Sequence, residues 1–342
     1  MINQRILFIA PSYMDLYKDI IKEMERQNYV VDFIEEKSFK DDPLNNRGNK
    51  RFGKIWVNTS DFEKKIDSYW RSVLNEDRYS YAYDILFVLD GQSLRSVVFE
   101  ILKQRNPKIK TVNYLFDSTG IYHFEQNFDN FNHVFTFDPA DADKYKLTLL
   151  PIYYVDESPC DHFHYHIFGM GAIKEDRYRV FKEIVDIAKK NNLTYFLRLY
   201  VFFDIKNRSL YRLRCKIYNL LGLDSISLEA IDSEFATKQT ISPQEFRTYT
   251  YNSDVIIDTS AVHQKGLTAR FMWALGANKK IVTTNRAVMD NSFYDKNQIY
   301  VMGEDRTLEN FIKGAYEPNK ENLEIINRFR IDNWVRQILT FE

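Results

Sequence analysis

The stretch from Tyr251 to Asn285, YNSDVIIDTSAVHQKGLTARFMWALGANKKIVTTN, decides the fold of this chain. Its apolar run at 254–258 is short and bounded by polar residues, which predicts a buried strand. A helix follows from Gly266, with apolar residues along one face, and ends at the glycine of GAN. Residues 279–284 predict the next strand. The stretch is therefore a βαβ unit of a parallel sheet.

The loop of this unit, residues 259–268, lies at the carboxyl end of the first strand. Backbone N–H groups meet the N-terminus of a helix there, and this combination suits the binding of a phosphate. We interpret the rest of the chain as two halves that build a cleft around this loop.

Composition narrows the class of protein. The chain has 342 residues, which suggests two α/β domains or one large one. Its 47 basic and 48 acidic residues give a net charge of −1, which argues against a dedicated nucleic-acid-binding protein. The two cysteines, Cys160 and Cys215, match neither a disulfide framework nor a zinc site and are typical of a reducing cytoplasm. No segment predicts a signal peptide or a membrane span, so we expect a cytoplasmic protein.

Both halves of the chain alternate strands with helices. Strands are predicted at 5–10, 29–34, 84–89, 111–116, 133–137 and 147–154, and then at 164–168, 194–200, 254–258, 279–284 and 299–302. Helices are predicted at 15–27, 61–75, 93–102, 174–190, 209–221, 266–275, 308–316 and 321–339. The polar segment DESPCD at 156–161 is typical of a linker and divides the chain into domains 1–160 and 161–342.

Three predicted strands of the first half are each followed by an aspartate, namely Asp90, Asp117 and Asp138. The carboxyl ends of strands line the ligand crevice of an open α/β sheet, which makes these carboxylates candidate catalytic residues. Each aspartate also suits the cap of the helix or turn that follows it. The sequence leaves both interpretations open.

Glycines and basic residues mark further candidate sites for an anion. Gly169 and Gly171 end the first strand of the second half, and Arg177 lies near the start of the helix that follows. The glycines suit a phosphate-binding turn or a tight turn alone, and Arg177 suits a phosphate or the surface. The basic segment 37–56 is a solvated surface loop in one interpretation and binds an acceptor or a lipid phosphate in the other.

Several segments together carry a resemblance to a known family. They are QKGLTAR at 264–270, ALGANKKIVTTN at 274–285, YLFDS at 114–118, FTFDP at 135–139 and LP at 150–151. They are similar to segments of bacterial capsular polysaccharide and lipopolysaccharide biosynthesis proteins. The chain as a whole resembles a GT-B glycosyltransferase, with two Rossmann-like domains whose parallel sheets face a cleft and a C-terminal helix that closes back.

The resemblance implies transfer of a sugar from a nucleotide-activated donor to a glycan or lipid-linked acceptor, without an obligatory metal or other cofactor. It implies that the C-terminal domain binds the donor diphosphate and that the N-terminal domain faces the acceptor. Beside Gly169, Gly171 and Arg177, the implied phosphate-binding residues are His263, Gln264, Lys265, Gly266, Leu267, Thr268 and Arg270. As a lone loop histidine, His263 is equally well incidental. Because such acceptors are often linked to lipids, we also expect possible contact with the inner face of the membrane.

Glycosyl transfer with inversion needs a general base on the acceptor hydroxyl. Asp117 is the first candidate, because it follows a central strand of the N-terminal half, and Asp90 and Asp138 come after it.

The chain departs from the family at Trp273. The family has a glutamate there, three residues after the arginine, and related GT-B enzymes use it to bind the donor ribose. An indole offers one N–H donor and no acceptor to the ribose hydroxyls. Three alternatives follow: the ribose is held otherwise, the donor differs, or activity is weak or lost. Two other functions stay open: a nucleotide-sugar epimerase, which binds the nucleotide without an acceptor, and a non-catalytic nucleotide-sugar-binding subunit, which Trp273 favours.

Overall fold

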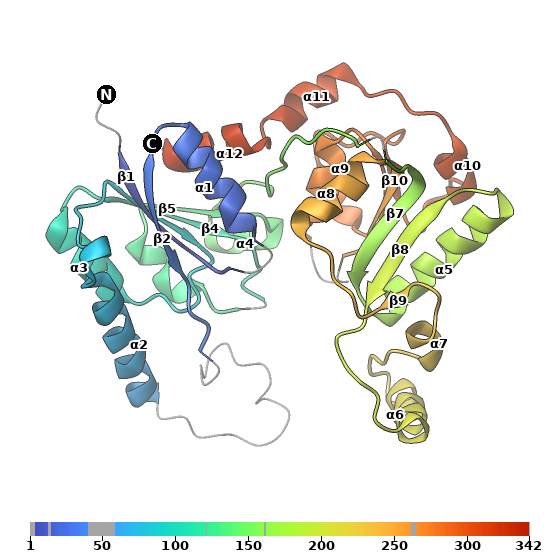
Figure 1. Cartoon of the computed structure of the whole chain (residues 1–342), viewed down its shortest axis with the longest axis horizontal. Helices are drawn as coiled ribbons and strands as arrows, with labels where there is room; N and C mark the ends of the chain where they lie inside the picture. The colour runs from blue at the N-terminus through green and yellow to red at the C-terminus, as the bar shows by residue number, and fades with distance from the viewer. Residues whose placement is uncertain are drawn as a thin grey trace. The chain divides into compact units, whose positions relative to one another are not determined.

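The computed structural model describes residues 4–12, 15–39, 59–120, 122–160, 162–260 and 265–341. The chain divides into two compact units: residues 1–153 with 331–342 form unit 1, and residues 154–330 form unit 2. Each unit contains a six-stranded parallel sheet (Figure 1). The boundary predicted at residue 160 lies within unit 2, and the last helix, assigned above to the C-terminal domain, is part of unit 1.

The sheet of unit 1 has the strand order β2-β1-β3-β4-β5-β6. Its strands are β1 (Arg5–Ala10), β2 (Val30–Glu35), β3 (Ile85–Leu89), β4 (Lys110–Leu115), β5 (His133–Thr136) and β6 (Thr148–Leu149). Its helices are α1 (Leu16–Arg26), α2 (Thr59–Leu74), α3 (Ser96–Arg105), α4 (Pro139–Tyr145) and α12 (Ile331–Leu339), with 3₁₀ turns η3 (Asp77–Tyr79) and η4 (Glu125–Asn130). The strand predicted at 147–154 shrinks to β6, because Pro151 has no N–H to continue the ladder.

Apolar side chains on both faces of the unit 1 sheet explain why helices cover it on each side. Every residue of β3, ILFVL, is buried. Trp70 of α2 and Leu102 of α3 join the core on one face. On the other face, Trp334 of α12 is fully buried against Tyr114 and Tyr153, and its Nε1 donates to the Pro151 carbonyl oxygen at 3.1 Å. The closing helix is therefore anchored by a large apolar side chain.

The sheet of unit 2 has the strand order β12-β11-β10-β7-β8-β9. Its strands are β7 (Tyr165–Ala172), β8 (Tyr195–Tyr200), β9 (Ala236–Thr237), β10 (Ser253–Asp258), β11 (Lys280–Thr283) and β12 (Ile299–Val301). Its helices are α5 (Glu175–Lys190), α6 (Arg208–Leu220), α7 (Leu228–Ile231), α8 (Pro243–Tyr251), α9 (Ala269–Gly276), α10 (Leu308–Lys313) and α11 (Lys320–Asn327), with a 3₁₀ turn η5 (Arg286–Asp290).

The predicted βαβ unit at 251–285 is confirmed as β10, α9 and β11. The helix begins at Ala269 rather than Gly266, because Thr268 is its N-cap. The turn predicted at 169–171 is wrong, since β7 continues to Ala172. The single helix predicted at 321–339 is also wrong. It breaks into α11 and α12 at residues 328–330, where Arg330 forms a β-bridge with Tyr154.

Candidate functional site

The sheet of unit 2 reverses its strand order between β7 and β10, which pair in parallel. In open α/β sheets, ligands bind at the carboxyl ends of the strands beside such a reversal. The segments that follow these two strands are 172–177 and 259–270. They are therefore the first place to look for a ligand site in unit 2.

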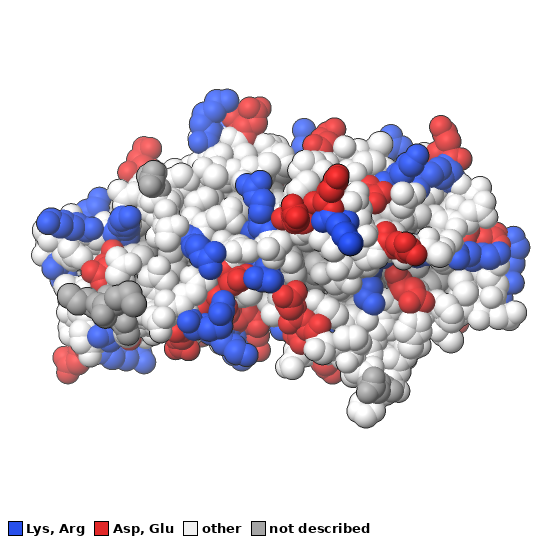
Figure 2. Space-filling model, turned by 90° about the horizontal axis from the view of Figure 1, so that it is seen from above, with Lys and Arg blue, Asp and Glu red and all other residues white. Residues whose placement is uncertain are grey.

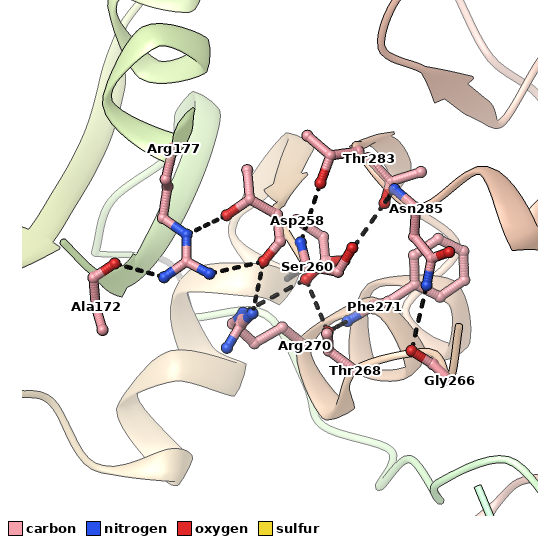
Figure 3. Close-up of polar contacts among 12 residues, drawn as sticks. Ala172, Arg177, Asp258, Ser260, Gly266, Thr268, Arg270, Phe271, Thr283 and Asn285 are labelled. Carbon is pink, nitrogen blue, oxygen red and sulfur yellow. Dashed lines mark hydrogen bonds and ion pairs between the residues drawn. The ribbon is translucent and has the colours of Figure 1, made fainter. Parts of the chain in front are cut away.

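Arg177, in the first turn of α5, holds the end of β10 (Figure 3). Its Nη2 donates to the Thr259 carbonyl oxygen at 2.9 Å, its Nε donates to the Thr259 hydroxyl, and its Nη1 donates to the Ala172 carbonyl oxygen at 2.5 Å. Arg177 is only 7% exposed, so the interpretation of it as a surface arginine is wrong. Burial, and then the positive charge of Arg270, lower the pKa of Arg177 to about 10, which leaves it protonated at neutral pH.

Asp258, the last residue of β10, is the buried carboxylate of the cluster and is 1% exposed. Its Oδ1 accepts a hydrogen bond from the Thr268 hydroxyl at 2.7 Å, and its Oδ2 accepts one from the Thr283 hydroxyl at 3.4 Å. The Thr268 oxygen also accepts a hydrogen bond from the Phe271 N–H at 3.1 Å and so caps α9 (Figure 3). The one hydroxyl proton of Thr268, expected above to reach a phosphate, is therefore committed to Asp258.

Arg270 lies beside these residues, at the start of α9. Its Nη2 donates to the Thr259 carbonyl oxygen at 3.2 Å, and its Nε lies 3.4 Å from Asp258 Oδ1 (Figure 3). Its side chain is 26% exposed, and no hydrogen bond engages its Nη1 within the part of the chain that the structure describes. With two guanidinium groups against one carboxylate, the cluster carries excess positive charge. Arg270 is the member that an anion can reach.

The loop that precedes α9 is held by Asn285, which follows β11. Its Nδ2 donates to the carbonyl oxygens of Lys265 and Gly266, both at 3.2 Å. Lys265 is exposed, whereas Gly266 and Leu267 are buried. The sequence analysis gave Asn285 no role. The available signal was its position as a polar residue directly after the strand predicted at 279–284. The predicted residues His263 and Gln264 lie outside the described residues.

Gly169 and Gly171 make room for packing. A Cβ on Gly169 would lie 2.8 Å from the Cβ of Ile257 on the neighbouring strand. A Cβ on Gly171 would lie 2.5 Å from Nη1 of Arg177. The second glycine therefore lets the buried guanidinium lie against the backbone of β7. Both glycines stand inside a strand, which corrects their interpretation as a phosphate-binding turn.

The carboxyl edge of the unit 1 sheet is acidic. Asp90 follows β3 with a left-handed backbone, at φ 60°, and its Oδ1 accepts hydrogen bonds from the backbone N–H groups of Phe116 at 2.7 Å and Asp117 at 3.2 Å. Burial, and then the negative charge of Asp117, raise the pKa of Asp90 well above its usual range. Asp90 and Asp117 are thus brought together at one edge of the sheet.

Glu36, which directly follows β2, is a member of this acidic edge that sequence reasoning missed. Its carboxylate accepts hydrogen bonds from the Gly91 N–H at 3.3 Å, the Ser93 N–H at 2.5 Å and the Ser93 hydroxyl at 3.0 Å. Burial raises the pKa of Glu36 to about 7, although these hydrogen bonds act in the opposite direction. Glu36 could have been found by the signal that identified the three aspartates, which is an acidic residue at the end of a predicted strand.

Asp138 lies at the same edge but has a local role. It is the N-cap of α4, and its Oδ1 accepts a hydrogen bond from the Ala140 N–H at 2.8 Å. It is buried, and burial raises its pKa. The capping interpretation is therefore confirmed for Asp138, which leaves Asp90 and Asp117 as the candidate catalytic pair.

Trp273, at the position of the family glutamate, lies in the core of unit 2 and is 1% exposed. Its ring packs against Phe246 of α8, and the guanidinium of Arg247 lies 5.5 Å from its centroid. Its Nε1 has no hydrogen-bond partner among the described residues. A side chain enclosed in this way does not reach a ribose.

No group of histidine, cysteine, aspartate and glutamate side chains among the described residues has the arrangement of a metal site. None of the helices that the structure describes combines the length and the apolar composition that a membrane crossing requires.

Comparison with known proteins adds to this geometry. No protein-family model matches the sequence, and no curated protein matches it. The N-terminal domain of trehalose-6-phosphate phosphatase from Candida albicans is similar in structure, with a TM-score of 0.51 at 11% identity, over 98% of this chain and 95% of that one. The two-domain architecture is GT-B-like.

Two further solved structures match over nearly the whole chain. The lipopolysaccharide outer core galactosyltransferase WaaB has a TM-score of 0.49 at 12% identity, over 98% of this chain and 99% of that one. The UDP-GlcNAc 2-epimerase from Methanocaldococcus jannaschii has a TM-score of 0.47 at 12% identity, over 98% of each chain. At identities this low, substrate and activity have to be argued from the residues of the site.

Proposed function

We propose that this GT-B-like protein transfers a sugar from a nucleotide-activated donor to a glycan or lipid-linked acceptor in surface polysaccharide biosynthesis. The observation that carries the proposal is the cluster of Arg177, Arg270 and Asp258 at the strand reversal of unit 2. It combines excess positive charge with the start of a helix and one partly exposed guanidinium. A diphosphate is the part of the donor that this chemistry recognises.

Arg270 would bind the diphosphate and would stabilise the charge that develops on it as the sugar leaves. Arg177 would act as a positioning residue, because two of its hydrogen bonds hold Thr259 and the third holds Ala172, and the Thr259 carbonyl oxygen also accepts from Arg270. Lys265 would supply a second accessible cation. We further propose that these cations meet the leaving-group charge without an obligatory metal.

Asp117 would be the general base for the acceptor. In this step the acceptor oxygen bonds to the anomeric carbon, the bond from that carbon to the diphosphate oxygen breaks, and the acceptor proton passes to the Asp117 carboxylate. Asp90 would support this role, because burial and the negative charge of Asp117 raise its pKa and so favour the negative charge of the pair on Asp117.

A second candidate function is nucleotide-sugar binding without transfer. Trp273 favours it, because the buried indole removes the carboxylate that holds the donor ribose in the enzymes that the chain resembles. A bound donor without any turnover would select this candidate over the first.

Thermal-shift measurements with UDP, GDP, CMP, dTDP and their sugars, with and without magnesium, test the proposal. A ligand that binds the folded state raises the free energy of unfolding, by about 2.7 kcal/mol at a hundredfold excess over its Kd, and the melting temperature rises with it. We expect a shift with one nucleotide class, and its diphosphate form should be effective without magnesium. No shift with any of these ligands would overturn both candidate functions.

A further inference from the structure

Among the residues that the structure describes, helix α6 contacts unit 2 through one side. The Tyr211 hydroxyl donates to the Ile226 carbonyl oxygen at 3.0 Å, and the Cys215 Sγ donates to the same oxygen at 3.3 Å. The Tyr211 ring also stacks on Phe203. Figure 1 shows α6 beyond the β9 edge of the sheet, with α7 beside it. These contacts fix which side of the helix faces away from the protein.

The side that faces away is apolar. Leu210, Leu213, Ile217, Leu220 and Leu221 are 64%, 54%, 46%, 87% and 64% exposed. At 100° per residue these five positions fall within a stripe about 100° wide, opposite Tyr211 and Cys215. Sequence analysis predicted the helix correctly. A helix whose only apolar stripe packed on the protein would bury these leucines, and α6 leaves them in contact with water.

The charges around the stripe have one sign. Between Asp204 and Asp224 the chain has no acidic residue and five basic ones, which are Lys206, Arg208, Arg212, Arg214 and Lys216. By helical geometry Arg214 and Lys216 border the stripe on its two sides. The nearby acids Asp204 and Asp232 form ion pairs with Lys238 and Arg208. On the face shown in Figure 2, by contrast, basic and acidic side chains are interspersed.

We propose that α6, the docking helix, lies on an anionic phospholipid surface. Its leucines and isoleucine would enter the boundary between headgroups and acyl chains, while its basic side chains contact lipid phosphates. Charge complementarity selects this occupant over a second copy of the chain, because pairing two docking helices would bring like charges together. The helix has the composition of a segment that lies in the plane of the membrane surface.

Flotation of the full-length protein with vesicles tests this proposal. We expect the protein to float with vesicles of phosphatidylcholine and phosphatidylglycerol and to stay in solution with phosphatidylcholine alone. The variant Leu213→Gln with Ile217→Gln should lower the partition coefficient by about tenfold or more. The variant Arg214→Gln with Lys216→Gln should lower it by roughly tenfold at low salt, and less at high salt.

Matched controls change the same residue types elsewhere on the surface. Leu149→Gln with Met289→Gln replaces two apolar side chains that are 46% and 50% exposed, and Lys64→Gln with Arg71→Gln replaces two exposed cations of α2. Both pairs should leave flotation unchanged. All substituted side chains are exposed, so unchanged melting temperatures will show that the fold is intact.

Three results would overturn the proposal. The first is no flotation with anionic vesicles, and the second is wild-type flotation of the Leu213→Gln and Ile217→Gln variant. The third is self-association, or capture of an acidic protein, that depends on the docking helix in the absence of lipid binding. Flotation needs neither donor nor acceptor, so the docking helix and the proposed glycosyl transfer can fail separately.

Discussion

The carboxyl edges of the two sheets differ in charge, although both sheets are parallel and six-stranded. In unit 1 the strands end in carboxylates, with Glu36 after β2, Asp90 after β3 and Asp117 after β4. In unit 2 the strands beside the reversal lead to two guanidinium groups around the single buried carboxylate of Asp258. The comparison separates a surface suited to accepting a proton from one suited to binding an anion.

The difference also shows that one topology can fill the N–H groups at a strand reversal with its own carboxylate in one unit and place cations there in the other. At the strand reversal of unit 1, between β1 and β3, the N–H groups of Gly91 and Ser93 already donate to the Glu36 carboxylate. The chain fills this anion site itself. In unit 2 the first turn of α9 is capped by the hydroxyl of Thr268, which is neutral, and Arg270 adds positive charge beside it.

The largest expected effect comes from removing the base at the acidic edge. Asp117→Asn should lower turnover by roughly 10²- to 10⁴-fold, the usual contribution of a general base, while donor affinity stays unchanged. Turnover is measured as nucleotide release in the presence of the donor and an acceptor glycan, and donor affinity is measured by thermal shift. Asp138→Asn is the matched control, because it makes the same change at the same edge on a residue that caps a helix, and it should leave turnover per folded molecule as it is. Wild-type turnover of Asp117→Asn would reject the base.

A second prediction places a carboxylate in α9, the helix that begins at the basic edge. Trp273→Glu should destabilise unit 2 by about 3–5 kcal/mol, because it removes a large buried aromatic side chain and buries a charge in its place. Trp273→Phe should cost less, since the indole Nε1 has no partner to lose among the described residues. Chemical denaturation measures both. Trp273→Glu with wild-type stability and gained nucleotide affinity would mean that residue 273 faces the donor.

A third prediction concerns the carboxylate that fills the unit 1 edge. The pKa of Glu36 is about 7 in the folded state against an ordinary value of 4.5, so its contribution to stability is complete below pH 4.5 and is lost as pH rises through 7. The loss is on the order of 3 kcal/mol, at about 1.4 kcal/mol per pH unit. Glu36→Gln should therefore gain stability relative to wild type between pH 5 and pH 8.

Denaturation curves at several pH values measure this gain, and the exposed neighbour Glu35→Gln serves as the control. A difference in stability between Glu36→Gln and wild type that does not change with pH would contradict the raised pKa.

The sequence predicts the fold of this protein better than it predicts the hydrogen bonds of the candidate site. Apolar runs such as ILFVL of β3 predict the two parallel sheets, because burial on both faces requires them. The same runs do not show where a strand ends, and so Gly169 and Gly171 were misplaced in a turn. The space that the buried Arg177 needs decided their positions. Glu36 was missed, and the hydrogen bond of the Thr268 hydroxyl was not predicted, for a related reason: their partners, Ser93 and Asp258, are distant in sequence.

The measurement that tests the central claim most directly is the affinity of Arg270→Ala for the nucleoside diphosphate that the thermal-shift panel selects. Calorimetry would compare it with wild type and with Arg179→Ala, which removes an exposed arginine of α5. We predict that Arg270→Ala weakens binding by roughly ten- to a hundredfold, as expected for a charge-assisted hydrogen bond worth about 1.5–3 kcal/mol, and that Arg179→Ala binds as wild type does. Equal affinities of all three proteins would contradict a donor site at the basic edge of unit 2.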